Sequence, residues 1–121
     1  MRLELPAISR TTLALYAGAS GDHNPMHIDL DVARGAGAPD VFAHGMLSMA
    51  YLGRLLTALV PQERIRSYAV RFTAITPLYG RPVCEATVTR AEDGLTHLDL
   101  TVTLDDGTLT LKGQAIIEGA L

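Results

Sequence analysis

The sequence has a single cysteine, Cys84, and no tryptophan among its 121 residues. One cysteine excludes an intrachain disulfide and any zinc module built on several cysteines. Charged residues are also scarce, at 19% of the chain, and the formal net charge is −3. An acidic chain lacks the basic surface that attracts phosphate backbones, so we expect no nucleic-acid partner.

Long apolar runs are missing as well. The longest, residues 46–60, is interrupted by Gly53 and Arg54 and ends at Pro61, so it is too short to span a bilayer. The first residues are too few and too acidic for a signal peptide. We therefore expect a cytoplasmic protein with no membrane association, folded as one domain over residues 1–121.

The first half of the chain carries helical patterns. Ser9 or Thr11 can cap a helix that runs to about Ala19, and Asp29 can cap a short helical turn. A longer helix is predicted over residues 44–60. This segment is apolar almost all round, which is typical of a helix buried on every side.

The second half alternates between apolar and polar residues, which is the pattern of antiparallel strands with one buried face. The alternating segments are residues 67–73, 84–89, 97–104 and 109–117. Asp93-Gly94 and Asp106-Gly107 are tight-turn dipeptides between them. The pattern predicts a four-strand antiparallel meander after a long helix, an α+β fold with a sheet curled around that helix.

Polar functional groups gather in residues 16–29. Asp22 and His27 lie five positions apart in a loop that Pro25 stiffens, because proline excludes the helical conformation for the residue before it. A carboxylate and an imidazole that converge on one water can orient it, take its proton and return that proton elsewhere. Taken alone, however, these residues favour an ordinary turn, since Gly-Asp-x-Asn-Pro is good loop chemistry.

A second cluster, Phe42-Ala43-His44-Gly45-Met46, stands where the long helix begins. The N–H groups of a first helical turn have no partner inside the helix. A glycine there lets a ligand approach the backbone closely. Developing negative charge is stabilised at a helix N-terminus, as in an oxyanion hole.

A metal site is not expected from these residues. His23 and His27 have the four-residue spacing of helical metal sites, but Pro25 excludes that helix and no third ligand is evident. For His44 we expect a structural role, capping the helix or bonding to a loop. No glycine-rich nucleotide fingerprint is present, so we expect no nicotinamide or flavin cofactor.

The run Y-A-G-A-S-G-D-H-N-P-M-H, residues 16–27, resembles the hydratase motif of MaoC-like hot-dog proteins. These are the (R)-specific enoyl-CoA hydratases and (3R)-hydroxyacyl-ACP dehydratases. The likeness continues in F-A-H-G-M-L-S-M-A (42–50) and V-R-F-T-A-I-T-P (70–77), in the family's order. The resemblance implies a single hot-dog domain, an antiparallel sheet wrapped around a long central helix.

The resemblance also implies roles for individual residues. Asp22 and His27 match the catalytic pair, and Gly45 matches the glycine whose N–H binds the thioester carbonyl. Substrate-binding positions are expected at Asn24, which also shapes the loop, at His44 and at Met46. Met46 belongs to a stripe with Met49 and Leu52 that we expect to be mainly core. Some family members carry a supporting serine on the central helix, where this chain has Gly53; Ser48 lies nearer the helix start.

The implied activity is a lyase of fatty acid metabolism that adds water reversibly to trans-2-enoyl thioesters of CoA or acyl carrier protein. No metal or other cofactor is implied. A homodimer with sheets paired edge to edge is expected. Alternatives are an acyl-binding or catalytic subunit of a heterodimeric dehydratase, and a hot-dog acyl-CoA thioesterase. Several such thioesterases place a carboxylate on the central helix, and residues 41–62 contain none.

Overall fold

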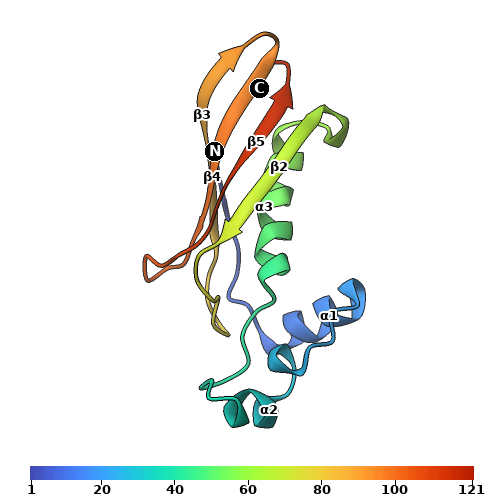
Figure 1. The fold of residues 1–121 in the computed structure, drawn as a ribbon, viewed down its shortest axis with the longest axis vertical. Helices are drawn as coiled ribbons and strands as arrows, with labels where there is room; N and C mark the ends of the chain where they lie inside the picture. Colours follow the sequence, from blue (N-terminus) through green and yellow to red (C-terminus); the bar gives the residue numbers. More distant parts are fainter.

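Three helices occupy most of the first half of the chain in the computed structural model, which describes residues 1–121 (Figure 1). They are α1 (Arg10–Ser20), α2 (Leu30–Gly35) and α3 (Gly45–Leu59). The Ser9 hydroxyl accepts the N–H of Thr12 at the start of α1, and the Asp29 carboxylate accepts two N–H groups at the start of α2. Such caps satisfy N–H groups that a helix leaves without partners. The predicted helices and caps are confirmed.

Five strands form one antiparallel sheet that lies against α3 (Figure 1). They are β1 (Arg2–Glu4), β2 (Ile65–Phe72), β3 (Val83–Glu92), β4 (Leu95–Thr103) and β5 (Leu109–Glu118). Asp93 and Gly94 join β3 to β4 with φ of 53° and 74°. Positive φ at both central residues is the geometry of a tight hairpin turn, as the dipeptide predicts.

The predicted four-strand meander is wrong in two respects. The sequence pattern does not reveal β1, which pairs with β3 through Leu3 and Cys84. In addition, β2 does not neighbour β3; the sheet order is β1-β3-β4-β5-β2, so β2 pairs with β5 at the opposite edge. The connection from Phe72 to Val83 is too long for a hairpin loop, which frees β2 to pair elsewhere.

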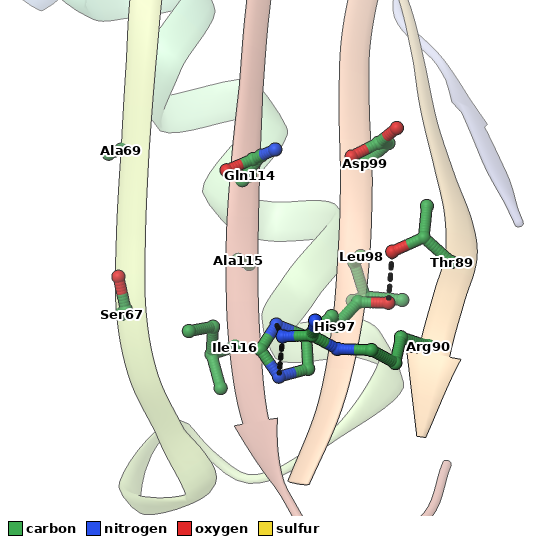
Figure 2. Close-up of a pocket in the computed structure, with 10 residues that line it drawn as sticks. All are labelled: Ser67, Ala69, Thr89, Arg90, His97, Leu98, Asp99, Gln114, Ala115 and Ile116. Carbon is green, nitrogen blue, oxygen red and sulfur yellow. Dashed lines mark hydrogen bonds between the residues drawn. The ribbon is translucent and has the colours of Figure 1, made fainter. Parts of the chain in front are cut away.

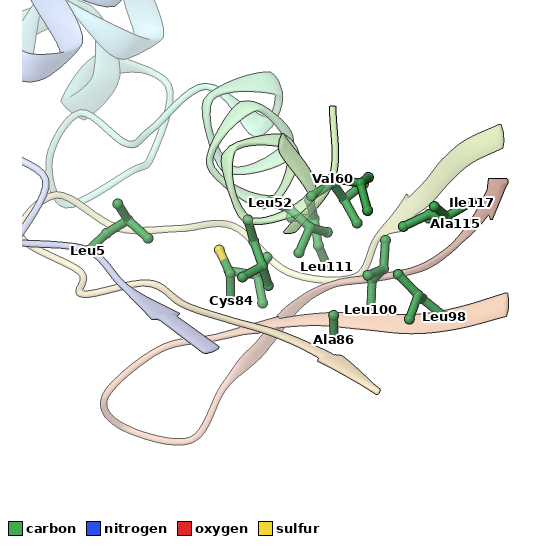
Figure 3. Close-up of a cluster of buried hydrophobic side chains, with 13 residues drawn as sticks. Leu5, Leu52, Val60, Cys84, Ala86, Leu98, Leu100, Leu111, Ala115 and Ile117 are labelled. Atoms are coloured by element: carbon green, nitrogen blue, oxygen red, sulfur yellow. The ribbon is translucent and has the colours of Figure 1, made fainter. Parts of the chain in front are cut away.

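The main core lies between α3 and the inner face of the sheet (Figure 3). Leu52 and Leu56 of α3 are fully buried against Leu100 of β4 and other inward-facing strand residues. Cys84 is buried among them, as its place in the alternation predicts. Burial raises the pKa of the Cys84 thiol to about 11, so this residue behaves as a small hydrophobe.

A smaller apolar cluster holds α1 and α2 against the start of α3. Its members are Ile8, Leu13, Ala33, Val41, Ala43 and Leu47. Above it, the Arg10 guanidinium donates two hydrogen bonds to the Asp40 carboxylate, at 3.1 and 2.7 Å. The segment that precedes α3 is therefore anchored to α1 both by this ion pair and by Val41 and Ala43 in the cluster.

One side of α3 is open, contrary to the expectation of a helix buried all round. Met46, Ala50, Arg54 and Thr57 are exposed along one stripe at helical spacing. Met46 is 53% exposed, so its assignment to the core is wrong. A single sheet covers only one side of a helix, and nothing in this chain covers the other. No membrane-spanning helix is found in the structure.

β2 approaches β5 very closely at Gly113. A Cβ added to Gly113 would overlap the carbonyl oxygen of Ala69 and lie 2.8 Å from Cγ1 of Val70. We predict that Gly113→Ala lowers the free energy of unfolding by about 1–3 kcal/mol, because β2 would have to move away. Urea denaturation monitored by circular dichroism measures this change.

Gly18→Ala is the matched control. Gly18 lies within α1, and a Cβ there would meet nothing within 4 Å. This substitution should raise the free energy of unfolding by about 0.5–1 kcal/mol, because alanine favours the helix. A Gly113→Ala protein as stable as the parent would show that this close approach does not constrain the sheet.

Candidate active site

The loop between α1 and α2 is shaped by a series of side-chain-to-backbone hydrogen bonds. The Ser20 hydroxyl accepts the N–H of Asp22 at 3.1 Å, and the Asp22 carboxylate accepts the N–H of Asn24 at 3.2 Å. The Asn24 side chain accepts the N–H of Met26 at 3.1 Å, at the start of a 3₁₀ turn over Pro25–His27. Each of these bonds closes a local turn of the kind that these residue types favour. The loop thus holds Asp22 and His27 in fixed positions.

Two imidazole rings connect this loop to the segment before α3. His27 donates from Nδ1 to the carbonyl of Phe42 at 2.7 Å, and His44 donates from Nε2 to the carbonyl of Asp22 at 3.1 Å. A carbonyl can only accept, so these bonds fix the tautomer of each neutral ring. Nε2 of His27 and Nδ1 of His44 are left with free lone pairs. The rings stack with centroids 4.0 Å apart.

His44 is buried at the centre of this arrangement. It is 1% exposed, and its Nδ1 has no hydrogen-bond partner. The ring of Tyr16 meets it edge-on, with ring centroids 4.8 Å apart. Burial lowers the pKa of His44, which keeps the ring neutral. Burial, together with the charge of Asp22, raises the pKa of Tyr16. His44 bonds to a loop, as one of the two predicted structural roles requires, and does not cap α3.

A cavity of about 360 Å³ opens beside His27 and the first residue of α3. It is lined by His27, Phe42, Ala43, Gly45, Phe72, Thr73, Ala74, Ile75, Thr76 and Leu111. The first N–H groups of α3 point out of the helix without a side-chain cap. A Cβ on Gly45 would lie 3.1 Å from Cε1 of Phe72, so only glycine keeps this end of the cavity uncrowded.

Asp22 completes the group of polar atoms. An oxygen of its carboxylate, a nitrogen of His27 and a nitrogen of His44 all lie within 4.8 Å of one another. Two groups that share one bridging water stand up to about 5.5 Å apart. Asp22 is exposed whereas both histidines are buried, so the carboxylate faces solvent and the imidazoles face the protein. The geometry is suited to holding one water.

The structure brings three candidate ligands together, Asp22, His27 and His44, whereas the sequence analysis considered His23 with His27 and found no third; His23 is not in this group. Ring geometry nevertheless fits an ion poorly. The planes of His27 and His44 are inclined by only 27°. A metal binds in the plane of each imidazole, so two nearly parallel rings would need one of them to turn. That rotation would break a hydrogen bond to the carbonyl of Phe42 or of Asp22.

Other sequence-predicted residues lie outside the cavity. Asn24 is exposed and uses its side chain to cap the 3₁₀ turn, and Met46 points outward from the first turn of α3. Ser48 is buried with its hydroxyl 3.5 Å from that of Thr76. Gly53 lines a different cavity, beside Tyr68. Phe72 is the residue that sequence reasoning missed. The strand alternation predicts on which face of the sheet Phe72 lies, but not that it lines this cavity.

Comparison with known proteins gives one consistent family. The family model described as "MaoC like domain" matches residues 4–104. The (R)-specific enoyl-CoA hydratase of Rhodospirillum rubrum is 31% identical over 114 residues, 93% of this chain and 76% of that protein. The 3-hydroxyacyl-thioester dehydratase X of Mycobacterium tuberculosis is 34% identical over 104 residues, 78% of this chain. The match spans only 36% of that second relative.

Solved structures share the fold. An (R)-hydratase from A. caviae, involved in PHA biosynthesis, superposes with a TM-score of 0.88 at 23% identity, covering 99% of this chain and 93% of that one. A chain of the ChsH1-ChsH2 complex from Mycobacterium tuberculosis gives 0.85 at 21% identity, covering 99% and 94%. The five-strand sheet with a central helix is therefore the hot-dog fold, as the sequence resemblance implies.

The lowered pKa of His44 makes stability depend on pH. The unfolded chain binds a proton at the ordinary pKa of 6.5 that the folded chain excludes, so stability is full above that pH and falls as the pH drops below it. We predict that the melting temperature falls between about pH 7.5 and about pH 5.5, and falls less in His44→Gln. Glutamine can still donate to the Asp22 carbonyl but does not ionise. If the melting temperatures of the two proteins fall equally with pH, His44 is not the cause of this pH dependence.

Proposed function

We propose that this chain, which belongs to the MaoC-like dehydratase family, is a hydro-lyase that interconverts trans-2-enoyl and (3R)-3-hydroxyacyl thioesters. The family acts on acyl thioesters, and the relatives from R. rubrum and M. tuberculosis are a hydratase and a dehydratase by name. The observation that carries the proposal is the Asp22–His27 pair beside the uncapped start of α3.

In the hydration direction, one water bridges the Asp22 carboxylate and Nε2 of His27. The water oxygen forms a bond to C3 of the substrate while one of its protons passes to the pair. The π electrons of the C2–C3 double bond move onto the thioester oxygen, which the Gly45 N–H stabilises. The proton then goes to C2, and the thioester carbonyl is restored. Dehydration runs the same steps backward.

The fixed tautomers support these roles of Asp22 and His27. Because Nδ1 of His27 donates to the Phe42 carbonyl, its Nε2 carries the lone pair that a base requires. Asp22 keeps one carboxylate oxygen for the N–H of Asn24, which orients the other. Asn24 acts by positioning this loop. His44 holds the loop through the Asp22 carbonyl. A bridging water would thus contact both the proton acceptor, Nε2 of His27, and the positioned carboxylate of Asp22.

The catalytic assignment is tested with Asp22→Asn and His27→Ala. Each should lower the rate of enoyl-thioester hydration by about 10²–10⁴-fold, because each removes one side of the proton-transfer pair. The loss of absorbance of the conjugated enoyl thioester measures the rate, and chiral analysis identifies the product. Fast release of free thiol in place of hydration would identify a thioesterase instead.

Matched substitutions serve as controls. Asp93→Asn and His97→Ala make the same chemical changes in the β3–β4 turn and on the outer sheet face (Figure 2). Both should keep the parent rate. Near-parental rates in Asp22→Asn and His27→Ala as well would remove the pair from the mechanism.

The open surfaces support a two-chain assembly. β2 is an edge strand, and the exposed stripe of α3 beside it contains Met46 and Ala50. Unpaired edges and exposed apolar side chains are where chains associate. We propose a homodimer joined along β2. A heterodimer is the alternative, as in the ChsH1-ChsH2 complex, whose chain shares this fold.

Light scattering tests the assembly. The parent should have twice the mass of one chain, and Ala50→Glu, which places a charge on the exposed stripe of α3, should shift it toward a monomer. Circular dichroism confirms that the variant is folded. A monomeric, fully active parent would contradict the dimer. A monomer that gains activity only with a second hot-dog chain would establish the heterodimer.

A further inference from the structure

Two cations face each other on the outer surface of the sheet. Arg71 of β2 and Lys112 of β5 are cross-strand partners, so their side chains leave the same face. The adjacent pair, Phe72 and Leu111, points to the opposite, inner face, where Leu111 is buried. Arg71 and Lys112 are both exposed, and neither forms an ion pair.

This pair is an exception among the basic residues of the strands. Arg2, Arg66 and Arg90 each pair with a glutamate. Like charges directly opposite each other on neighbouring strands destabilise a sheet. Arg71 and Lys112 therefore carry an uncompensated repulsion, which an anion between them would remove.

The cavity that contains the two cations also contains one carboxylate, Asp99. The β-ladder pairs Asp99 with Gln114, whereas Lys112 pairs with Thr101. Figure 2 shows Ala69, Gln114 and Asp99 in one row across β2, β5 and β4. Asp99 thus lies in the neighbouring row and forms no ion pair with either cation.

The end of β2 connects this cavity to the candidate active site. Thr73, the residue after β2, lines both the cavity with His27 and Gly45 and the cavity with Arg71 and Lys112. The two cavities therefore adjoin at Thr73, at the end of β2.

We propose that Arg71 and Lys112 bind the phosphate of the phosphopantetheine arm that carries the acyl group. The inference rests on the proposed function, because an acyl thioester of CoA or of acyl carrier protein joins its sulfur to a phosphate through one long flexible arm. Arginine and lysine are the usual phosphate ligands, and hydrogen bonds between charged partners are the strong ones. With the thioester at Gly45, the arm runs past Thr73 to the cations.

The test compares substrates with and without that phosphate. The double variant Arg71→Gln/Lys112→Gln should raise KM for crotonyl-CoA by about tenfold or more, with kcat unchanged. KM for the crotonyl thioester of N-acetylcysteamine, which has no phosphate, should not change. Salt should raise KM for crotonyl-CoA in the parent and have less effect in the double variant.

A second arm uses crotonyl thioester on phosphopantetheinylated acyl carrier protein, which has the same phosphate without the nucleotide. KM should rise in the double variant for each carrier that the parent accepts, and the carrier with the lower parental KM is the natural source. An effect confined to the carrier protein when both are accepted would assign the cations to its protein surface and overturn the proposal.

Arg90→Gln is the matched control, since Arg90 on β3 pairs with Glu92; it should change no KM. The double variant should melt no lower than the parent, because the repulsion is relieved. An equal rise in KM for the N-acetylcysteamine thioester, or no rise for any carrier, would overturn the phosphate site. A parent that hydrates none of these thioesters would instead overturn the proposed function.

Discussion

The candidate site depends on two hydrogen bonds that run in opposite directions between the same two segments. His27, in the loop after α1, donates to the carbonyl of Phe42 before α3, and His44 donates back to the carbonyl of Asp22 in that loop. Each bond fixes a tautomer and a ring orientation, and the stacked rings add a further contact between the two segments. The position of the Asp22 carboxylate follows from this cross-link, because its own backbone is one of the acceptors. Burial keeps His44 neutral, so the cross-link adds no charge beside the reacting water.

Local chemistry determined what the sequence could predict. The caps at Ser9 and Asp29, the turn at Asp93-Gly94 and the alternation of the strands each depend on neighbours in the chain, and the structure confirms them. β1 has three residues, too few for a period to show. The pairing of β2 with β5 depends on contacts across the whole second half. The link from His44 to Asp22 spans 22 positions and leaves no local signal, so sequence reasoning left its role open.

Two glycines let β2 approach its neighbours. Gly113 of β5 leaves room for Ala69 and Val70, where a Cβ would overlap them. Gly45 at the start of α3 leaves room for the ring of Phe72. The Tyr68 hydroxyl, which donates to the Met49 carbonyl at 2.6 Å, holds β2 against the same helix. These contacts place the end of β2 beside the uncapped start of α3.

The same strand serves both faces because side chains alternate along it. Phe72 points inward beside Gly45, and Arg71 points outward beside Lys112. A slip of β2 by one residue along β5 would exchange these faces, placing Arg71 on the inner face and Phe72 on the outer one. Gly113 opposes that slip, because the residues flanking it, Lys112 and Gln114, carry side chains that could not accept the close approach of Ala69 and Val70. In the observed register, Phe72 lines the cavity of the candidate active site, and its neighbour along β2, Arg71, lies on the other face at the proposed phosphate site.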